Sequence, residues 1–227
     1  MIKSDEILTE VKTILNSKWD TREGIKIPEV EDITLSSNEA VLLDATVLYA
    51  DMRQSTNLVD TYDKEFAAKV YKTFLLSSSK IIQNLDGKIT AFDGDRIMAI
   101  FIGDYKNSYA TKTAMHIKYL VSKINEEIPK SFNTQYKLNF GVGIDTSNIF
   151  ATRTGMWNYN DIVWLGKASN YAAKYSELGK NPNNIVISKN VYDRLRDNVK
   201  NSNGRNMWNF DVINGLSVYK TSYHWSF

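Results

Sequence analysis

The stretch VLYADMRQST, from Val47 to Thr56, places a carboxylate, Asp51, directly after an apolar run. A second edge of this kind occurs in DGDRIMAIF, where Asp95 stands between two further apolar runs, at about 88–93 and 97–102. Carboxylates at the ends of neighbouring strands can hold divalent cations, because Mg²⁺ prefers oxygen ligands in a rigid geometry. The sequence therefore favours nucleotide chemistry beside a polyphosphate.

Composition predicts one soluble domain with a short extension, divided as residues 1–40 and 41–227 of a 227-residue chain that is 43% hydrophobic and 24% charged. The absence of cysteine excludes disulfides, thiolate zinc sites and a cysteine nucleophile. A net charge of +2 gives no support for nucleic-acid binding. No apolar run reaches the roughly 18 residues of a membrane span, and the N-terminus mixes charges, so we expect a cytosolic protein.

Periodicity and turn signals predict an α+β fold, with an antiparallel-rich sheet and packed helices. The first helix, 4–17, should dock through an apolar stripe on the domain or on a second copy of the chain. Pro129 should end a helix that starts at 107, and the polar segment 145–148 should turn a hairpin. The expected helices are 4–17, 55–85, 107–128, 166–178 and 189–196, and the expected strands are 41–49, 88–93, 97–102, 136–144, 149–153, 161–165, 185–187, 208–212 and 216–220.

Four blocks in order resemble the catalytic domain of class III nucleotidyl cyclases, which has a ferredoxin-like core. They are LYADMRQST at 48–56, DGKITAFDGDRIMAIF at 86–101, GVGIDTSNIFATRTG at 141–155 and GKASNYAAK at 166–174. The N-terminal Trp19, the Arg22-Glu23-Gly24 segment, Pro28 and the LLDATVLYAD run ending at Asp51 are similar to the pyrimidine cyclases of the Pycsar antiphage systems. Those enzymes make cyclic UMP or cyclic CMP.

The resemblance implies a metal site and a catalytic pair. Asp51, Asp95 and the carbonyl of Met52 would hold two Mg²⁺ or Mn²⁺ ions. Asn170 and Lys174, four residues apart on one helix face, would orient the ribose and meet charge on the α-phosphate. Lysine replaces the arginine of the family and loses its planar fork. The plain alternatives are a helix-capping Asp51 and a solvated helix face.

Phosphate binding is expected at the start of the helix after Asp51. The backbone N–H groups of Arg53, Gln54, Ser55 and Thr56 would face the triphosphate, where the positive helix end favours anions, and the Thr56 hydroxyl would be a further donor. Many relatives carry a lysine pair near the C-terminus, where this chain has Ile213-Asn214-Gly215. Candidate replacements are Lys167, Lys180 and Arg205.

Base recognition departs from the purine-cyclase pattern. Ala91 stands where adenylyl cyclases have a lysine, and Val163 stands where they have an aspartate or threonine, although a bulge there would bring in Asp161 or Trp164. Tyr49 and Trp164 would narrow the pocket until a single-ring base fits. The remaining candidate is Arg96, as a donor to a pyrimidine carbonyl, and core packing or a surface charge is the plain alternative for these residues.

The family also implies a homodimer with two composite active sites, in which one chain gives the metal aspartates and the other gives the asparagine–cation pair. The glycines at 141 and 143 would allow close approach at that interface. The favoured reading is a cyclase that converts UTP, or else CTP, to the 3′,5′-cyclic monophosphate and pyrophosphate and signals phage infection to a separate effector. The alternatives are a purine cyclase in which Asp161 faces the base, and a non-catalytic nucleotide-sensing dimer module.

Overall fold

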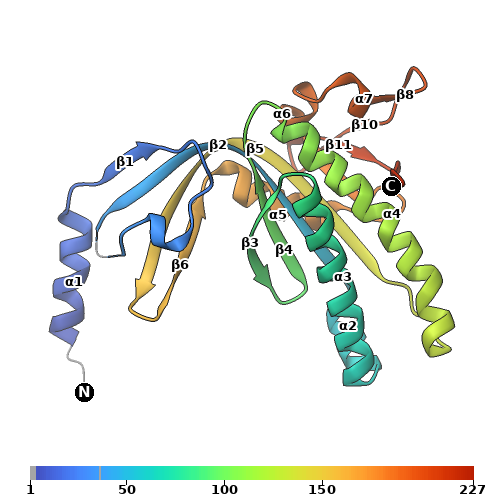
Figure 1. Ribbon diagram of the computed structural model, residues 1–227, viewed down its shortest axis with the longest axis horizontal. Helices are drawn as coiled ribbons and strands as arrows, with labels where there is room; N and C mark the ends of the chain where they lie inside the picture. The colour runs from blue at the N-terminus through green and yellow to red at the C-terminus, as the bar shows by residue number, and fades with distance from the viewer. Residues whose placement is uncertain (1–3, 36) are drawn as a thin grey trace. The chain divides into compact units, whose positions relative to one another are not determined.

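The computed structural model describes residues 4–35 and 37–227, in which helices pack on a mixed sheet (Figure 1). The predicted α+β class is confirmed. The strands are β1 Asp20–Glu23, β2 Glu39–Arg53, β3 Lys88–Asp93, β4 Arg96–Phe101, β5 Asn139–Met156, β6 Tyr159–Leu165, β7 Ile185–Ser188, β8 Asn201–Ser202, β9 Arg205–Asn206, β10 Asn209–Ile213 and β11 Leu216–Thr221. The helices are α1 Ser4–Asn16, α2 Ser55–Thr61, α3 Lys64–Asn84, α4 Lys106–Phe132, α5 Lys167–Leu178, α6 Lys189–Asp193, α7 Asp197–Lys200 and a 3-10 turn, Val30–Asp32.

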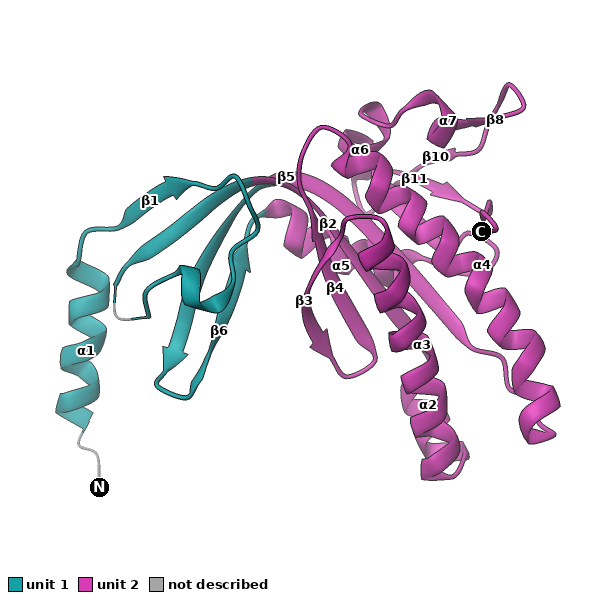
Figure 2. Ribbon diagram, viewed as in Figure 1, with its two compact units in different colours: residues 1–43, 148–166 teal, residues 44–147, 167–227 magenta. Residues whose placement is uncertain are grey.

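The chain forms two compact units, residues 1–43 with 148–166 and residues 44–147 with 167–227 (Figure 2). Both long strands, β2 and β5, pass from one unit into the other. In the first unit β1 pairs in parallel with β2, and β6 pairs with the end of β5. The ring of Trp19 stacks on Phe150 with centroids 6.0 Å apart. The first unit therefore consists mainly of two strand pairs, β1 with the start of β2 and β6 with the end of β5, and α1 precedes β1 in the sequence.

Helix α1 has the predicted apolar stripe, but none of its residues is buried. Docking of this stripe on the chain's own domain is thus not observed among the described residues. The end of the helix is held instead by the Asn38 carboxamide, which donates to the carbonyls of Ile14 and Ser17. The exposed apolar residues of the stripe are Ile7, Leu8, Val11, Ile14 and Leu15.

The sheet of the second unit has the strand order β10-β11-β7-β5-β2-β4-β3, and buried clusters lie on both of its faces. Leu48, Ala50 and Met52 of β2 belong to the large core beneath α3 and α4. Because side chains alternate along a strand, Tyr49, Asp51 and the other odd residues of this stretch face the opposite side. Helix α5 lies on that side (Figure 1). Its Tyr175 packs with Val186 and Val218.

Three local predictions were wrong. The 55–85 helix is broken at Tyr62 and Asp63, and the Asp63 carboxylate caps α3 by accepting from the N–H of Phe66. Helix α4 passes Pro129 and ends at Asn133, which takes a left-handed conformation while its N–H bonds to the Pro129 carbonyl. No turn occurs at 145–148, because Thr146 is buried in β5 and its hydroxyl bonds to the Ala45 carbonyl, so polar character there marks buried hydrogen bonding.

Gly141 and Gly143 permit a close approach, but to α5 of the same chain. A Cβ at Gly141 would lie 2.1 Å from the carbonyl oxygen of Ser176, and one at Gly143 would lie 2.0 Å from that of Ala172. These distances exclude any side chain. The two glycines therefore set how closely α5 lies on β5.

No helix within the described residues is long and apolar enough to cross a bilayer.

Candidate active site

The two predicted metal aspartates come together at the end of the β2–β4 pair. Asp51 lies opposite Arg96 in the antiparallel register, and the Met52 N–H donates to the Asp95 carbonyl over 3.3 Å. The tight turn between β3 and β4 uses Gly94 at a φ of +60°, where glycine carries no steric penalty. The predicted adjacency of Asp51 and Asp95 is thus present in one compact unit.

Asp51 is 6% exposed, and burial is the largest influence on the pKa of its carboxyl. Burial raises the pKa of its carboxyl, and the hydrogen bond and charge of Arg96 act against that rise. The Arg96 Nη2 atom lies 3.1 Å from Asp51 Oδ2. A carboxylate kept in a largely dry position needs a cationic partner, and that partner is Arg96 within this structure.

The donor set at this edge fits a hard divalent cation. Asp51 and Asp95 supply two carboxylates, and oxygen donors suit Mg²⁺ or Mn²⁺. Within residues 4–35 and 37–227, no group of three or more His, Cys, Asp or Glu side chains is placed to hold a metal. Mg²⁺ commonly takes one or two protein carboxylates and completes its coordination with substrate phosphates and water.

Three candidates for base recognition share one face of the sheet. They are Tyr49, Ala91 and Arg96. In the strand register Tyr49 lies opposite Met98, and Met98 lies opposite Ala91, so Tyr49, Met98 and Ala91 form a row across β2, β4 and β3. The Tyr49 hydroxyl is 3.0 Å from the Met98 sulfur, and the Arg96 guanidinium lies 6.0 Å from the Tyr49 ring centroid. Because the Ala91 side chain is a single methyl group, Tyr49 and Met98 are the two large side chains of this row.

A second row lies directly beside the first, with Asp51, Arg96 and Asp93 in register. The sequence analysis missed Asp93, whose charge acts on both Arg96 and Tyr49. It also missed Met98. The two-residue period of β4, counted forward from Arg96, would have placed Met98 on this face, and the tight turn between β3 and β4 pairs Asp93 with Arg96.

Asp161 and Trp164 belong to the first compact unit, on β6. The Asp161 carboxylate accepts from the N–H of Ile162, next to it in the chain, and Asp161 is exposed. Trp164 is half-buried opposite Ala151. Their predicted part in base recognition therefore stays a prediction.

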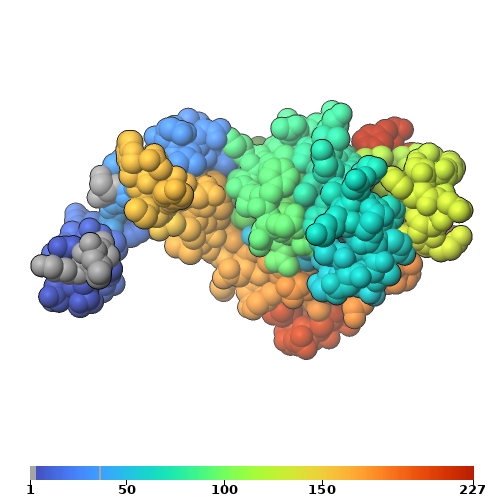
Figure 3. All heavy atoms as spheres, turned by 90° about the horizontal axis from the view of Figure 1, so that it is seen from below, coloured from blue at the N-terminus to red at the C-terminus, as the bar shows by residue number. Residues whose placement is uncertain are grey.

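The predicted catalytic pair lies on the outer face of α5. Asn170 and Lys174 are both exposed, whereas Ala168, Ala172 and Tyr175 are buried beneath the helix. In Figure 3 orange atoms of the chain segment that contains α5 reach the surface. The Lys174 ammonium lies 5.1 Å from the ring centroid of Tyr171. One helix face thus presents an amide and a cation to the outside.

Glu177 extends this face by one turn and was missed in the sequence analysis. Its Oε1 lies 3.8 Å from Arg96 Nη2, the nitrogen that also binds Asp51. At a rise of about 1.5 Å per residue, Asn170 lies roughly 10 Å farther along the helix axis than Glu177. The last turn of α5, and not the turn with Asn170, is therefore the part of the helix nearest to Asp51.

The predicted phosphate loop has an unexpected conformation. Gln54 has a φ of +60°, a left-handed value that costs a non-glycine residue about 1–2 kcal/mol. The helix after it, α2, has only seven residues, so its dipole is shorter than the predicted long helix would give. Ser55 and Thr56 still begin a helix, and first-turn N–H groups have no partner inside the helix.

The Arg53 side chain donates to the carbonyls of Ser176 and Gly179, so its guanidinium is engaged within the chain. Among the candidate lysines, Lys180 lines a hollow of about 370 Å³ together with Arg53 and Gln54. Lys180 is thus the candidate that the fold brings to the phosphate loop.

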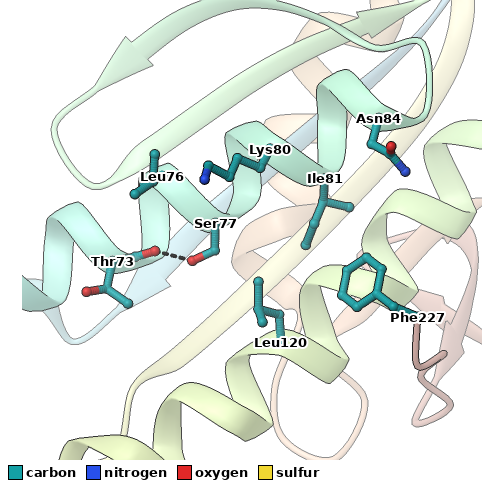
Figure 4. A pocket seen from close by; sticks show the side chains of 8 residues that line it. All are labelled: Thr73, Leu76, Ser77, Lys80, Ile81, Asn84, Leu120 and Phe227. Carbon is teal, nitrogen blue, oxygen red and sulfur yellow. Dashed lines mark hydrogen bonds between the residues drawn. The ribbon is translucent and has the colours of Figure 1, made fainter.

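A larger cavity, of about 540 Å³, lies between α3 and α4 (Figure 4). Leu76, Ile81, Leu120 and Phe227 give it an apolar lining, and no predicted site residue borders it. Asp51 and Asp95 therefore lie outside this cavity.

No family model matches the sequence. Two curated bacterial proteins called uridylate cyclase are similar over essentially the whole chain. Identity with the protein from Xanthomonas perforans is 39% over 227 residues, or 97% of each chain. Identity with the protein from Burkholderia cepacia is 40% over 231 residues, or 100% of each chain.

Solved cyclase structures share the fold. The adenylyl cyclase CyaB from P. aeruginosa aligns with a TM-score of 0.70 at 19% identity, over 81% of this chain and 95% of that one. The guanylate cyclase domain of RhGC from Catenaria anguillulae, solved with GTP, aligns with a TM-score of 0.62 at 14% identity, over 81% and 98%.

Proposed function

Because this chain belongs to the same family as the bacterial uridylate cyclases, within the class III nucleotidyl cyclases, we propose that it converts UTP to 3′,5′-cyclic UMP and pyrophosphate. CTP is the second candidate substrate. The observation that carries the proposal is the pair of neighbouring rows on one sheet face, with Asp51 and Arg96 in one and Tyr49 and Ala91 in the other. These rows support a metal-binding edge that lies beside an aromatic ring able to stack on the base.

Asp51, Asp95 and the Met52 carbonyl are the groups that would hold Mg²⁺ or Mn²⁺. Two bound ions would supply Lewis-acid chemistry, by acidifying the ribose 3′-hydroxyl and neutralising charge on the phosphates. The chain itself orients the triphosphate through the N–H groups from Arg53 to Thr56 and through the Lys180 ammonium. No side-chain nucleophile is needed, because the 3′-oxygen of the substrate attacks its own α-phosphate.

Base selection rests on size and on one donor. Tyr49 supplies a ring for stacking, and Ala91 supplies no polar group that would read an adenine edge. Arg96 has five N–H donors, and one Nη2 bonded to Asp51 leaves others for a pyrimidine carbonyl. In this proposal Asp161 and Trp164 of β6 are further candidates for contact with the base.

Asn170 and Lys174 would act in the active site of a second copy. The amide would hold the ribose, and the ammonium would meet charge that develops on the α-phosphate oxygens. A symmetric homodimer then contains two equivalent sites, each with aspartates from one copy and the α5 pair from the other. The exposed positions of Asn170 and Lys174 support this arrangement.

The product would serve as a second messenger in antiphage defence, read by a separate effector that does not stay bound to the cyclase. This part of the proposal rests on the resemblance to the pyrimidine cyclases of such systems. Cells that express the protein together with its effector should resist phage infection. Cells that express the Asp51→Asn variant with the same effector should lose this resistance.

The direct test is incubation of the purified protein with each of the four ribonucleoside triphosphates and Mn²⁺, with products identified by mass spectrometry. We expect cyclic UMP, with less cyclic CMP, and neither from Asp51→Asn. A cyclic purine as the main product would overturn the account of Tyr49, Ala91 and Arg96. No product from any triphosphate would favour a non-catalytic nucleotide-binding dimer.

A further inference from the structure

Arg53 holds the C-terminal end of α5. Its Nη2 atom donates to the Ser176 carbonyl over 2.6 Å and to the Gly179 carbonyl over 3.0 Å. The Lys180 N–H, four residues after Ser176, bonds instead to the Asn183 carbonyl over 3.0 Å. Arg53 therefore supplies the donor that the helix backbone withholds at this point.

The charge of Arg53 also suits this position. Carbonyls at a helix C-terminus carry the negative end of the helix dipole, and a cation there is favourable. The site is partly shielded, because Arg53 is half-buried and α5 lies against the side-chain-free surface of Gly141 and Gly143. A hydrogen bond from a charged donor in such a place is stronger than an exposed one.

A second arginine reaches the same turn. Arg96 bridges Asp51, at 3.1 Å, and Glu177 of α5, at 3.8 Å. Arg53 is two residues after Asp51 on β2, and Arg96 lies opposite Asp51 on β4. Two cations flanking Asp51 in the sheet thus converge on the last turn of the helix that carries Asn170 and Lys174.

We propose that the Arg53 side chain is a positioning residue that fixes α5 relative to the Asp51 end of β2, and so sets where Asn170 and Lys174 stand. The inference rests on the proposed function, in which that pair acts on the ribose and the α-phosphate. Since the pair serves the partner's site, Arg53 links the aspartate end of one active site to the catalytic pair of the other. Its backbone N–H keeps the phosphate role described above.

The test compares Arg53→Ala and Arg53→Lys with Arg194→Ala in the full-length protein. Arg194 is the matched control, because its guanidinium also donates to a helix carbonyl, that of Asn190, at 3.0 Å on α6. Hydrogen exchange of α5 amides and steady-state kinetics with UTP and Mn²⁺ are measured together. Exchange in α3 shows whether each variant is folded.

For Arg53→Ala we expect at least about tenfold faster exchange at the end of α5, as the loss of two hydrogen bonds from a charged donor implies. The turnover number should fall at least about tenfold while KM for UTP changes little, because an effect confined to the transition state lowers kcat. Arg53→Lys should recover part of both, and Arg194→Ala should change neither.

Unchanged exchange in α5 would overturn the inference, and a rise in KM alone would show instead that the side chain binds phosphate. Faster exchange with unaltered kcat would also overturn it, because the helix would then need no such support. A wild-type protein inactive on every triphosphate would defeat the proposed function, while the exchange result would still decide whether Arg53 holds α5.

Discussion

The Asp51 end of β2 and the outer face of α5 carry the two halves of the proposed active site, and they differ in how the fold treats them. Asp51 is buried and already paired with Arg96. Asn170 and Lys174 are exposed on an ordered helix, and the Lys174 ammonium lies near only the Tyr171 ring among the described contacts. The first half is therefore preorganised inside one chain, whereas the second faces outward, as the proposed role in the active site of a second copy requires.

Asp51→Asn should cause the largest loss. Removing one carboxylate from the buried half should lower kcat/KM by at least about 10³-fold, since metal-assisted charge stabilisation is worth several kcal/mol. Asp93→Asn, on an exposed acid of the same row, is the matched control and should keep most activity. If Asp51→Asn retains a tenth of the wild-type rate, Asp51 is a structural residue and its proposed role as a metal ligand is wrong.

Lys174→Ala should cost about 10²–10³ in kcat, the range for loss of one transition-state donor. Because Lys174 is exposed, the melting temperature should not change. Lys174→Arg should keep or raise kcat, since the guanidinium grips two oxygens. Lys72→Ala, an exposed lysine of α3, controls for net charge. Equal kcat in the two alanine variants would mean that the exposed half is only a solvated surface.

Removal of the metal should lower the free energy of unfolding only through the loss of metal binding at the Asp51 end of β2. Burial raises the pKa of Asp51 in the folded state, so its contribution to the free energy of unfolding is greatest at low pH and is lost as pH rises through that pKa. At neutral pH, Mg²⁺ at 100 times its Kd should restore about 2.7 kcal/mol. Urea titrations with Mg²⁺ and with EDTA measure this difference.

Asp51→Asn should abolish that Mg²⁺ response and flatten the pH dependence. Asp145→Asn is the matched control, because burial raises the pKa of Asp145 as well, in a place outside the proposed metal edge. It should keep the full Mg²⁺ response. A response that survives in Asp51→Asn would place the ion elsewhere.

Tyr49→Ala should weaken base selection by about 10- to 100-fold, expressed as the ratio of kcat/KM for UTP to that for ATP, because shape discrimination in a pocket is worth about 1–3 kcal/mol. Tyr49→Phe keeps the ring and removes only the hydroxyl contact with Met98, so it should keep the ratio. An unchanged ratio in the alanine variant would mean that Tyr49 is core packing.

Gln54→Gly should produce the smallest effect, a gain of about 1 kcal/mol in the free energy of unfolding, by relieving the left-handed conformation at Gln54. Asn133→Gly is the control, since Asn133 also has a positive φ but asparagine tolerates it. Urea denaturation measures both. If Gln54→Gly is destabilising, the side chain makes a contact that outweighs the strain.

Much of the fold could be predicted from the sequence, because the spacing of apolar residues along β2, β4 and α5 matches the side of each element that packs against its neighbours. The turn predicted at 145–148 did not occur, since Asp145 and Thr146 are buried polar residues whose partners lie on distant parts of the chain. A local pattern contains no information about such partners. The extra turn after Pro129 depends likewise on a cap, at Asn133.

At the site, the adjacency of Asp51 and Asp95 was predicted from two apolar runs that each end at an aspartate and from the family resemblance. The hairpin signal places Asp95 in the turn between β3 and β4, and the pairing of β2 with β4 brings Asp51 to the same edge. The Arg96 bridge to Glu177 and the Arg53 contacts with Ser176 and Gly179 were not predictable. They join residues more than 80 positions apart, through a helix whose depth on the sheet depends on Gly141 and Gly143. That distance is set by packing rather than by any motif.

The most direct test of the two-halved site is complementation between Asp51→Asn and Asn170→Ala. Each variant alone should be nearly inactive on UTP. In an equal mixture half of the dimers pair the two variants, and each such dimer has one intact site, so about one quarter of the wild-type rate should return. No recovery, with mixed dimers verified by native mass spectrometry, would show that Asn170 and Asp51 do not meet across two copies.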